Sequence, residues 1–123
     1  MFYRCEECDS VLMQIFNSHS EINCCGKLLT PIKPQKPDDL HTIFADFNGD
    51  NVTVTIGERN HPMDSEHRIL FITVQTRDRI LIKKLPNNRR ASAKFHGVTG
   101  ECRIYAFCSV HGLFCDRIKN ALN

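Results

Sequence analysis

Side chains that bind transition metals are unusually frequent in this chain, and nine of them fall into two groups. In the first group, Cys5 and Cys8 place two sulfurs on one tight turn. The adjacent pair Cys24-Cys25 supplies two more, and Gly26 after them relaxes the backbone. Adjacent cysteines do not readily bond to each other because the disulfide is strained, but each can reach the same ion. Four thiolates suit tetrahedral zinc or iron, so the group predicts a metal site, with redox-idle thiols as the alternative.

The second group consists of imidazoles and one thiol that lie far apart in the chain: His41, His61, His67, Cys108 and His111. Cys108 and His111 form a short chelate at the end of an expected strand, and His41 opens the first strand of its segment. His61 and His67 bracket a loop that Pro62 stiffens. One histidine alone is more often a surface or core residue than a ligand. Five such residues, all at strand ends or in loops, favour a second metal site.

The bulk composition narrows the class of protein and its compartment. Seven cysteines, an odd number, and a start without an apolar leader are unlike a secreted disulfide scaffold. We therefore expect a cytoplasmic protein that uses its cysteines for metal. A net charge of +2 argues against nucleic-acid binding driven by electrostatics. No apolar run approaches the roughly 20 residues that span a membrane, so no membrane role is expected.

Short strands must position the second group of ligands. Residues 51–56 alternate, with Val52, Val54 and Ile56 on one face, and residues 101–108 alternate again. Residues 68–76 and 79–85 are rich in β-branched and apolar side chains. No segment has a helical period, so the chain is predicted to be all-β, with short strands in a sandwich. Cys102 shares a strand face with Cys108 and is expected to be a small buried core residue.

A proline-rich stretch divides the chain. Three prolines between residues 31 and 37 favour an extended, semi-rigid spacer. We place the boundary near residue 36, which gives a metal-binding segment, 1–36, and a β domain, 37–123. The first segment is too short to bury a core of its own and needs a staple such as a metal.

Together these motifs resemble desulfoferrodoxin, the two-iron superoxide reductase, over nearly the full length of the chain. The four cysteines of the first group are similar to the rubredoxin-like desulforedoxin knot. The remaining motifs are similar to the catalytic module shared with neelaredoxin: His41, His61-Pro62-Met63, His67 and Cys108-x-x-His111-Gly112-Leu113. The resemblance implies an immunoglobulin-like, seven-stranded β-sandwich with a square-pyramidal iron. The four imidazoles are then equatorial and Cys108 is axial.

The same resemblance implies a function. It is the one-electron reduction of superoxide to hydrogen peroxide at the Fe(His)4(Cys) centre, which an external donor such as rubredoxin re-reduces. It also implies iron or zinc at the four-cysteine site and a homodimer. Two alternatives stay open from the residues alone. One is an electron-transfer or metal-binding protein in which only the four-cysteine site is active. The other is a zinc-stabilised binding module without catalysis.

The chain departs from the family beside the first histidine. The family usually has Glu-Lys directly before it, and this chain has Asp39-Leu40. Asp39 keeps the carboxylate and is the candidate sixth ligand of ferric iron. Leu40 lacks the charge with which the family's lysine attracts superoxide, so we predict a weaker dependence of the rate on ionic strength. Lys33 or Lys36, folding back from the linker, is a possible substitute.

Several other residues differ from the family or have no assigned role. The family commonly has Asn after the cysteine and Trp near the end, where this chain has Ser109 and Phe114. Cys115 is expected to be a free thiol and His19 a surface residue, while His96 is a weak candidate for a partner of the ligands. One basic stretch is expected to be a solvated hairpin or a docking surface for an acidic electron donor: Lys83, Lys84, Arg89, Arg90 and Lys94.

Overall fold

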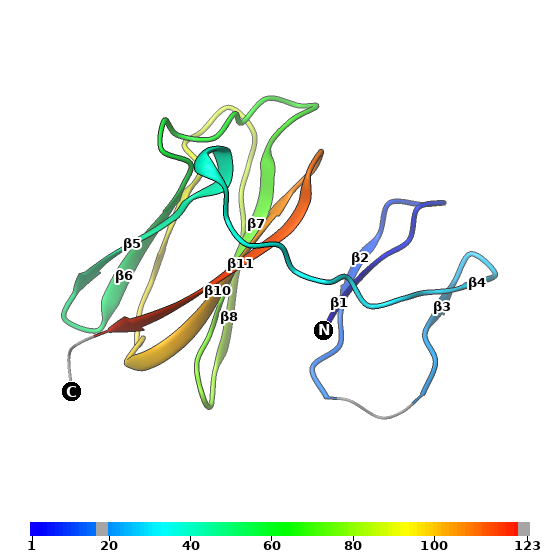
Figure 1. Cartoon of the computed structure of the whole chain (residues 1–123), viewed down its shortest axis with the longest axis horizontal. Coiled ribbons are helices and arrows are strands. Elements are labelled where there is room, and N and C mark those ends of the chain that lie inside the picture. Colours follow the sequence, from blue (N-terminus) through cyan, green and yellow to red (C-terminus); the bar gives the residue numbers. More distant parts are fainter. Residues whose placement is uncertain (17–19, 121–123) are drawn as a thin grey trace. The chain divides into compact units, whose positions relative to one another are not determined.

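The computed structural model describes residues 1–16 and 20–120, which leaves His19 outside the described residues. The chain divides into two compact units, Met1–Lys33 and Pro34–Asn123 (Figure 1). The division falls inside the proline-rich stretch, three residues before the position that composition suggests. In the described part of the chain, no helix is long and apolar enough to span a bilayer.

The first unit consists of two small hairpins. Strand β1 (Phe2–Arg4) pairs antiparallel with β2 (Val11–Met13), and β3 (Asn23–Cys24) pairs antiparallel with β4 (Lys27–Leu28). Among the described residues of this unit, only Phe2, Tyr3 and Cys5 are buried. So little buried apolar surface stabilises a fold weakly by itself.

The described part of the second unit, residues 34–120, forms seven strands in two antiparallel sheets, which confirms the predicted seven-stranded sandwich (Figure 1). One sheet has the order β11-β10-β7-β8, and the other has the order β5-β6-β9. The strands are β5 (Ile43–Asn48), β6 (Asn51–Ile56), β7 (Ile69–Gln75), β8 (Ile80–Lys84), β9 (Ser92–Phe95), β10 (Gly100–Cys108) and β11 (Gly112–Asn120). A single 3-10 turn, η1 (Asp39–His41), precedes β5.

The core lies between these two sheets and follows the alternation of the sequence. Val52, Val54 and Ile56 of β6 are fully buried, as their common face predicts. Alternate residues of β10 from Cys102 to Cys108 are buried opposite them in the same apolar cluster. The prediction that Cys102 is a small core residue is therefore confirmed.

The topology brings several strand ends together at one end of the sandwich. The first residue of β5, Ile43, pairs with the last residue of β6, Ile56. In the other sheet, Ile69 at the start of β7 pairs with Cys108 at the end of β10. The segments that precede β5, follow β6, precede β7 and follow β10 therefore all leave the sandwich at the same end. These segments carry the second group of ligands.

Two local expectations are wrong. His41 does not open a strand, because it lies in η1 and β5 begins two residues later. The basic stretch does not form a hairpin, because β8 pairs with β7 whereas β9 pairs with β6. The segment from residue 85 to residue 91 therefore crosses between sheets. A Pro-Asn-Asn turn signal is the same in a hairpin and in a crossover, which explains the error.

Candidate metal centres

The four-cysteine group comes together on two turns of the first unit. Cys5 starts a loop that two hydrogen bonds close. The Cys5 N–H donates to the Ser10 carbonyl (2.8 Å), and the Asp9 N–H donates to the Cys5 carbonyl (2.7 Å). Cys8 lies on that loop. Cys24 ends β3, and Cys25, with a left-handed φ of 51°, begins the two-residue turn to β4. A turn with two positive φ values suits a short hairpin, and here it directs neighbouring thiols to one side.

The sulfur spacing fits one tetrahedral ion. The four Sγ atoms lie within 4.8 Å of one another. The Cys8–Cys24 separation is 3.7 Å and the Cys24–Cys25 separation is 4.0 Å. Tetrahedral metal–sulfur bonds of about 2.3 Å place sulfurs about 3.8 Å apart, which matches these values.

The thiols of this group differ in pKa. Hydrogen bonds from the Ser10 hydroxyl and backbone lower the pKa of Cys8 to about 6. Hydrogen bonding with Cys5 and Cys8 raises the pKa of Cys24 to about 12, because a second thiolate is unfavourable beside the first. A bound cation removes that conflict by compensating several thiolates at once.

The second group forms a closed ring of imidazoles. Its edges, as distances between ring centroids, are 4.8 Å for His41–His61 and 4.8 Å for His61–His67. The other two edges are 5.1 Å for His67–His111 and 5.0 Å for His111–His41. Four nearly equal edges leave a common centre that all four rings surround. Residues up to 70 positions apart in the chain are thus neighbours in space.

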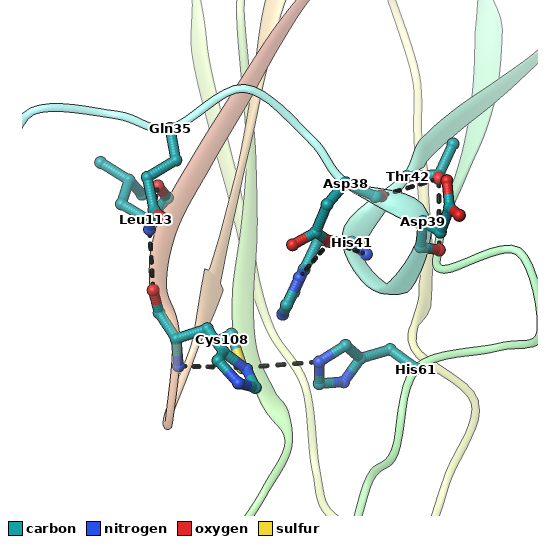
Figure 2. A network of polar contacts seen from close by, with 9 residues as sticks. Gln35, Asp38, Asp39, His41, Thr42, His61, Cys108 and Leu113 are labelled. Carbon is teal, nitrogen blue, oxygen red and sulfur yellow. Dashed lines mark hydrogen bonds and ion pairs between the residues drawn. The ribbon is translucent and has the colours of Figure 1, made fainter.

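The Cys108 thiol lies beside this ring, at the end of β10. Its Sγ lies 3.4 Å from His61 Nε2 (Figure 2). The same sulfur lies 3.5 Å from His111 Nδ1. The His111 backbone N–H points at the same sulfur from 3.4 Å. Cys108 is fully buried, whereas His111 is exposed, so one side of the ring opens towards solvent.

Two imidazoles have their outer nitrogens held by hydrogen bonds. The Asp38 carboxylate lies 2.7 Å from His41 Nδ1 and also accepts from the His41 backbone N–H at 2.9 Å (Figure 2). The Pro62 carbonyl lies 2.7 Å from His61 Nδ1. Both contacts place the proton on Nδ1 and leave Nε2 as a free lone pair directed inwards.

The inner nitrogens fit a metal ion. His41 Nε2 and His67 Nε2 are buried and have no hydrogen-bond partner among the described residues. A buried polar atom without a partner costs about 1–3 kcal/mol. Although these lone pairs are unsatisfied, four ligand atoms lie within 4.8 Å of one another, one from each of His41, His61, His67 and Cys108. A cation among them satisfies these lone pairs, and nitrogen with sulfur suits iron or zinc.

Burial keeps the inner histidines neutral, as metal ligation requires. Desolvation lowers the pKa of His61 to about 4, against the opposing hydrogen bond to Pro62. Desolvation also lowers the pKa of His41, although Asp38 acts in the other direction. The hydrogen bond from His41 holds the pKa of the Asp38 carboxyl below its usual range. Asp38 therefore stays a carboxylate at neutral pH and His41 a neutral imidazole.

Hydrogen bonds fix the His67 end of the loop from His61 to His67. The Asp64 carboxylate accepts hydrogen bonds from the backbone N–H groups of Glu66 (3.0 Å) and His67 (2.7 Å). Ser109, next to Cys108, accepts from the Arg68 N–H at 3.0 Å and donates to the Glu66 carbonyl at 3.2 Å. Ser109 thus ties the cysteine turn to the histidine loop.

The turn that carries His41 packs against the loop before His61. Gly57 has a φ of +90°, and a Cβ there would lie 2.8 Å from both His61 N and the Leu40 carbonyl oxygen. Only glycine fits this close approach. On the inner side, the Phe114 ring stacks on His41, with centroids 3.9 Å apart and planes 11° apart.

Asp39 lies in η1, exposed to solvent, and its backbone carbonyl accepts from the Thr42 hydroxyl at 3.3 Å (Figure 2). The same carbonyl accepts from Glu58 N–H at 3.2 Å. Asp39 lines a cavity of about 410 Å³ with Leu40, Gly57, Glu58, Arg59, Asn60 and His61. The carboxylate that contacts a histidine is the one on Asp38, which sequence reasoning missed. An Asp three residues before a ligand histidine, in an N-cap position, was the available signal.

The remaining candidates lie outside both groups. Cys102 and Cys115 belong to neither of the clusters that the described residues form. His96 is hydrogen-bonded to Asn51 (2.6 Å), at the opposite end of β6 from His61. It is therefore not a partner of the metal ligands.

Comparisons with known proteins agree with this architecture. A family model described as desulfoferrodoxin matches residues 42–117. Desulfoferrodoxin from Clostridium acetobutylicum is 31% identical over 98 residues, which cover 77% of this chain and 78% of that protein. Desulfoferrodoxin from Syntrophotalea carbinolica is 25% identical over 115 residues, 91% of each chain.

Solved structures give the same result. The superoxide reductase from Treponema pallidum superposes with a TM-score of 0.79 at 25% identity, covering 94% of this chain and 95% of that one. The one-iron superoxide reductase from Giardia intestinalis has a TM-score of 0.56 at 16% identity. It covers 68% of this chain and all of that chain, and at this identity it supports the fold alone.

Proposed function

The chain belongs to the desulfoferrodoxin family, and we propose that it is a superoxide reductase. The reaction is the one-electron reduction of superoxide, with two protons, to hydrogen peroxide. We propose His41, His61, His67, His111 and Cys108 as the ligands of a catalytic iron. Cys5, Cys8, Cys24 and Cys25 are proposed to hold a second metal, iron or zinc.

The closed ring of four imidazoles with a thiol beside it is the observation that carries this proposal. A structural zinc site usually has four ligands and is closed. Five protein donors, with one exposed histidine among them, suit a metal that keeps a position for a small ligand. Iron bound there supplies a reversible one-electron couple and a positive centre for an anion.

The protein's own contribution is to bind, orient and neutralise. Asp38 and the Pro62 carbonyl hold the imidazoles of His41 and His61 in one tautomer, so that the inner lone pairs face the same point. The neutral imidazoles add no negative charge, and only Cys108 contributes a thiolate, so the loaded site stays attractive to an anion. Asp39 is proposed to cover the ferric site, and protons are proposed to come from water.

Partners and location follow as further parts of the proposal. An external electron donor such as rubredoxin is required, because each turnover consumes one electron. We propose a homodimer by analogy with the family. The seven free cysteines support a reducing compartment such as the cytoplasm, where thiolates remain available to metal.

Metal content and the visible spectrum test the proposal, with spectra recorded for the oxidised protein, after its chemical reduction, and after a pulse of superoxide given to the reduced protein. We expect iron in the second centre and a thiolate-to-iron charge-transfer band that bleaches on reduction and returns after the pulse. Cys108→Ser should abolish this band and the activity. Cys115→Ser, which changes a half-buried cysteine outside both centres, should leave both intact.

The alternatives predict different spectra. If only the four-cysteine centre is active, the spectrum contains tetrahedral iron–sulfur bands alone and the superoxide pulse changes nothing in the second centre. If the protein is a zinc-stabilised module, it is colourless. Either result contradicts the proposed function.

A further inference from the structure

One residue of the linker, Gln35, is bound along strand β11 beside the second centre (Figure 2). Its backbone N–H donates to the Leu113 carbonyl at 2.9 Å, and its carbonyl accepts from Cys115 N–H at 3.0 Å. These two bonds make a parallel bridge to Phe114, the residue that stacks on His41. The side-chain amide donates to the His111 carbonyl at 2.7 Å.

The sequence on either side keeps this segment straight. Pro34 fixes its own φ, and Pro37 restricts Lys36 to extended conformations. An extended dipeptide between two prolines is already close to the geometry of a bridge. Ordering it against β11 therefore costs less conformational entropy than ordering a flexible linker.

The side-chain bond reaches the part of the second centre with the least support. The β10–β11 ladder ends at the pair Cys108–Gly112, so His111 lies in the turn beyond it. His111 is also the exposed member of the imidazole ring. Among the described residues, its carbonyl accepts a hydrogen bond from Gln35 alone. The amide lies so close to the turn that a Cβ on Gly112 would be 3.4 Å from Gln35 Nε2.

We propose that Gln35 is a positioning residue for the second metal centre. Its side-chain amide holds the turn from Cys108 to Gly112 at His111, while Ser109 of the same turn is hydrogen-bonded to Arg68 and to the histidine loop. The turn is therefore held at two of its residues, and the imidazole of His111 is already positioned at the ring before a metal binds. The consequence for the superoxide rate rests on the proposed function, whereas the consequence for metal affinity does not.

Two substitutions separate the amide from the backbone bridge. Gln35→Glu keeps the shape and the bridge but replaces the donating NH2 with an oxygen that repels the His111 carbonyl. Gln35→Leu keeps the bridge and removes the polar group. Loss of a residue that orients a ligand typically weakens metal binding about 10-fold to 100-fold. Because His111 is one of five ligands, we expect about 10-fold weaker zinc binding at the second centre in both variants.

The experiment is a zinc titration of the full chain against a competing chelator. The histidine side-chain nitrogen resonances of 15N-labelled protein report on the second centre and not on the four cysteines. Gln75→Leu is the matched control, because Gln75 lies at the other end of β7 from the metal centre. In the iron-loaded protein, Gln35→Glu should also shift the thiolate charge-transfer band, whereas Gln75→Leu should not.

The outcomes keep the two proposals apart. If Gln35→Glu and Gln35→Leu bind zinc at the second centre as tightly as the unchanged protein, the positioning role is wrong. If the iron-loaded unchanged protein does not reduce superoxide, the proposed function is wrong, and the zinc titration still decides the role of Gln35. A variant that unfolds is identified by its amide spectrum, and the isosteric Gln35→Glu then provides the decisive comparison.

Discussion

The two metal centres of this chain are built in opposite ways. The four-cysteine centre takes its ligands from two turns within the first 25 residues, in a unit whose described residues include three that are buried. The second centre takes its ligands from segments up to 70 positions apart, at the end of a sandwich with a continuous apolar core. The described part of the first unit thus has a short chelate and little buried core, whereas the second centre lies at the end of a sandwich with a core of its own.

The two units are therefore expected to differ in whether metal binding drives folding or folding forms the metal site. In the first unit, the described parts of the two hairpins bury almost nothing, so we expect a metal held by the four cysteines to supply the folding free energy. In the second unit, strand pairing and core packing place the imidazoles, so the fold supplies the site and the metal only occupies it. Removing metal, ligands and supporting hydrogen bonds in turn tests how far this contrast holds.

Metal removal should have the largest effect. Structural zinc contributes about 10 kcal/mol or more to the folding of small cysteine-rich units. With a strong chelator, we expect the amide resonances of Tyr3 and Leu12 to collapse to random-coil positions, while those of Val54 and Ile104 stay dispersed. The measurement is a 15N–1H spectrum before chelation, after it, and after zinc is added back. If the first unit keeps its dispersed resonances without metal, the contrast between the centres is wrong.

Loss of one sulfur in each centre should have the next largest effect. Cys24→Ser should unfold the first unit but leave the charge-transfer band of the second centre unchanged. Cys108→Ser should remove that band and lower superoxide reduction by at least about 100-fold, because it removes a ligand and not only a partner of one. The fold of the sandwich should persist in both variants, as judged by circular dichroism. A loss of the sandwich in Cys108→Ser would mean that the second centre also depends on its metal for folding.

A change one step outside the ligands should have a smaller effect. Asp38→Asn removes the carboxylate that fixes the tautomer of His41, and we expect about 10-fold to 100-fold weaker zinc binding at the second centre. Asp50→Asn is the matched control for metal affinity, because Asp50 is exposed in the turn between β5 and β6, at the end of these strands away from the second centre. Equal affinities in the two variants would show that Asp38 does not orient the ligand.

The two centres also differ in how much of them the sequence predicts. The first is local, so the spacing of Cys5, Cys8 and the adjacent pair is enough to predict a cluster. The alternation of residues 51–56 and 101–108 predicts the buried faces of β6 and β10, because the side-chain period of a strand is fixed. The spacing of the short strands predicts a sandwich, and the family resemblance adds that it is immunoglobulin-like with seven strands.

What the sequence does not reveal depends on long-range pairing or on short polar residues that have many roles. The closed ring requires that four strand ends meet, which no local pattern encodes. Gln35 looks like an ordinary linker residue until β11 lies beside it. Asp38 looks like a turn residue, although its position three residues before His41 was a usable signal. The basic stretch looked like a hairpin because its turn residues do not reveal which sheet the next strand joins.

The pH dependence of the metal-free sandwich should show a moderate effect. The pKa of His61 is lowered from 6.5 to about 4 by burial. As the pH falls below 6.5, His61 is therefore protonated in the unfolded chain, whereas in the folded chain it stays neutral until about pH 4. The free energy of unfolding should fall as pH drops across this window, by about 3 kcal/mol at most from this residue. The lowered pKa of His41 acts in the same direction.

Urea denaturation of the chelated protein between pH 7 and pH 4.5, followed on the sandwich resonances, measures this slope. His61→Gln is the control, because it removes the titrating group and should flatten the curve. A flat curve in the unchanged protein would show that His61 is not held neutral by its surroundings, and that the second site is less rigid before metal binding than the contrast requires.

Surface charge around the second centre should have the smallest effect. Leu40 is 41% exposed, beside His41, where the family has a lysine, so it offers no charge to an approaching anion. A single exposed charge at about 4 Å is worth about 1 kcal/mol in water and is screened by salt. Leu40→Lys should therefore raise the second-order rate with superoxide about 2-fold to 5-fold at low ionic strength. It should also steepen the dependence of the rate on salt.

The complementary change asks whether another cation already substitutes for that lysine. Lys36 is exposed and follows Gln35, whose side chain reaches the His111 carbonyl, and Arg59 lines the cavity that includes Leu40 and His61. We expect Lys36→Ala to lower the low-salt rate about 2-fold, and Arg59→Ala to do the same, with smaller salt slopes in both. Pulse radiolysis over a range of ionic strength measures each. If Lys36→Ala changes neither rate nor slope, Lys36 is not the substitute. If Leu40→Lys also changes neither the rate nor its salt dependence, the charge of the metal centre itself governs the approach of superoxide. Surface side chains then contribute little to the function of the second centre.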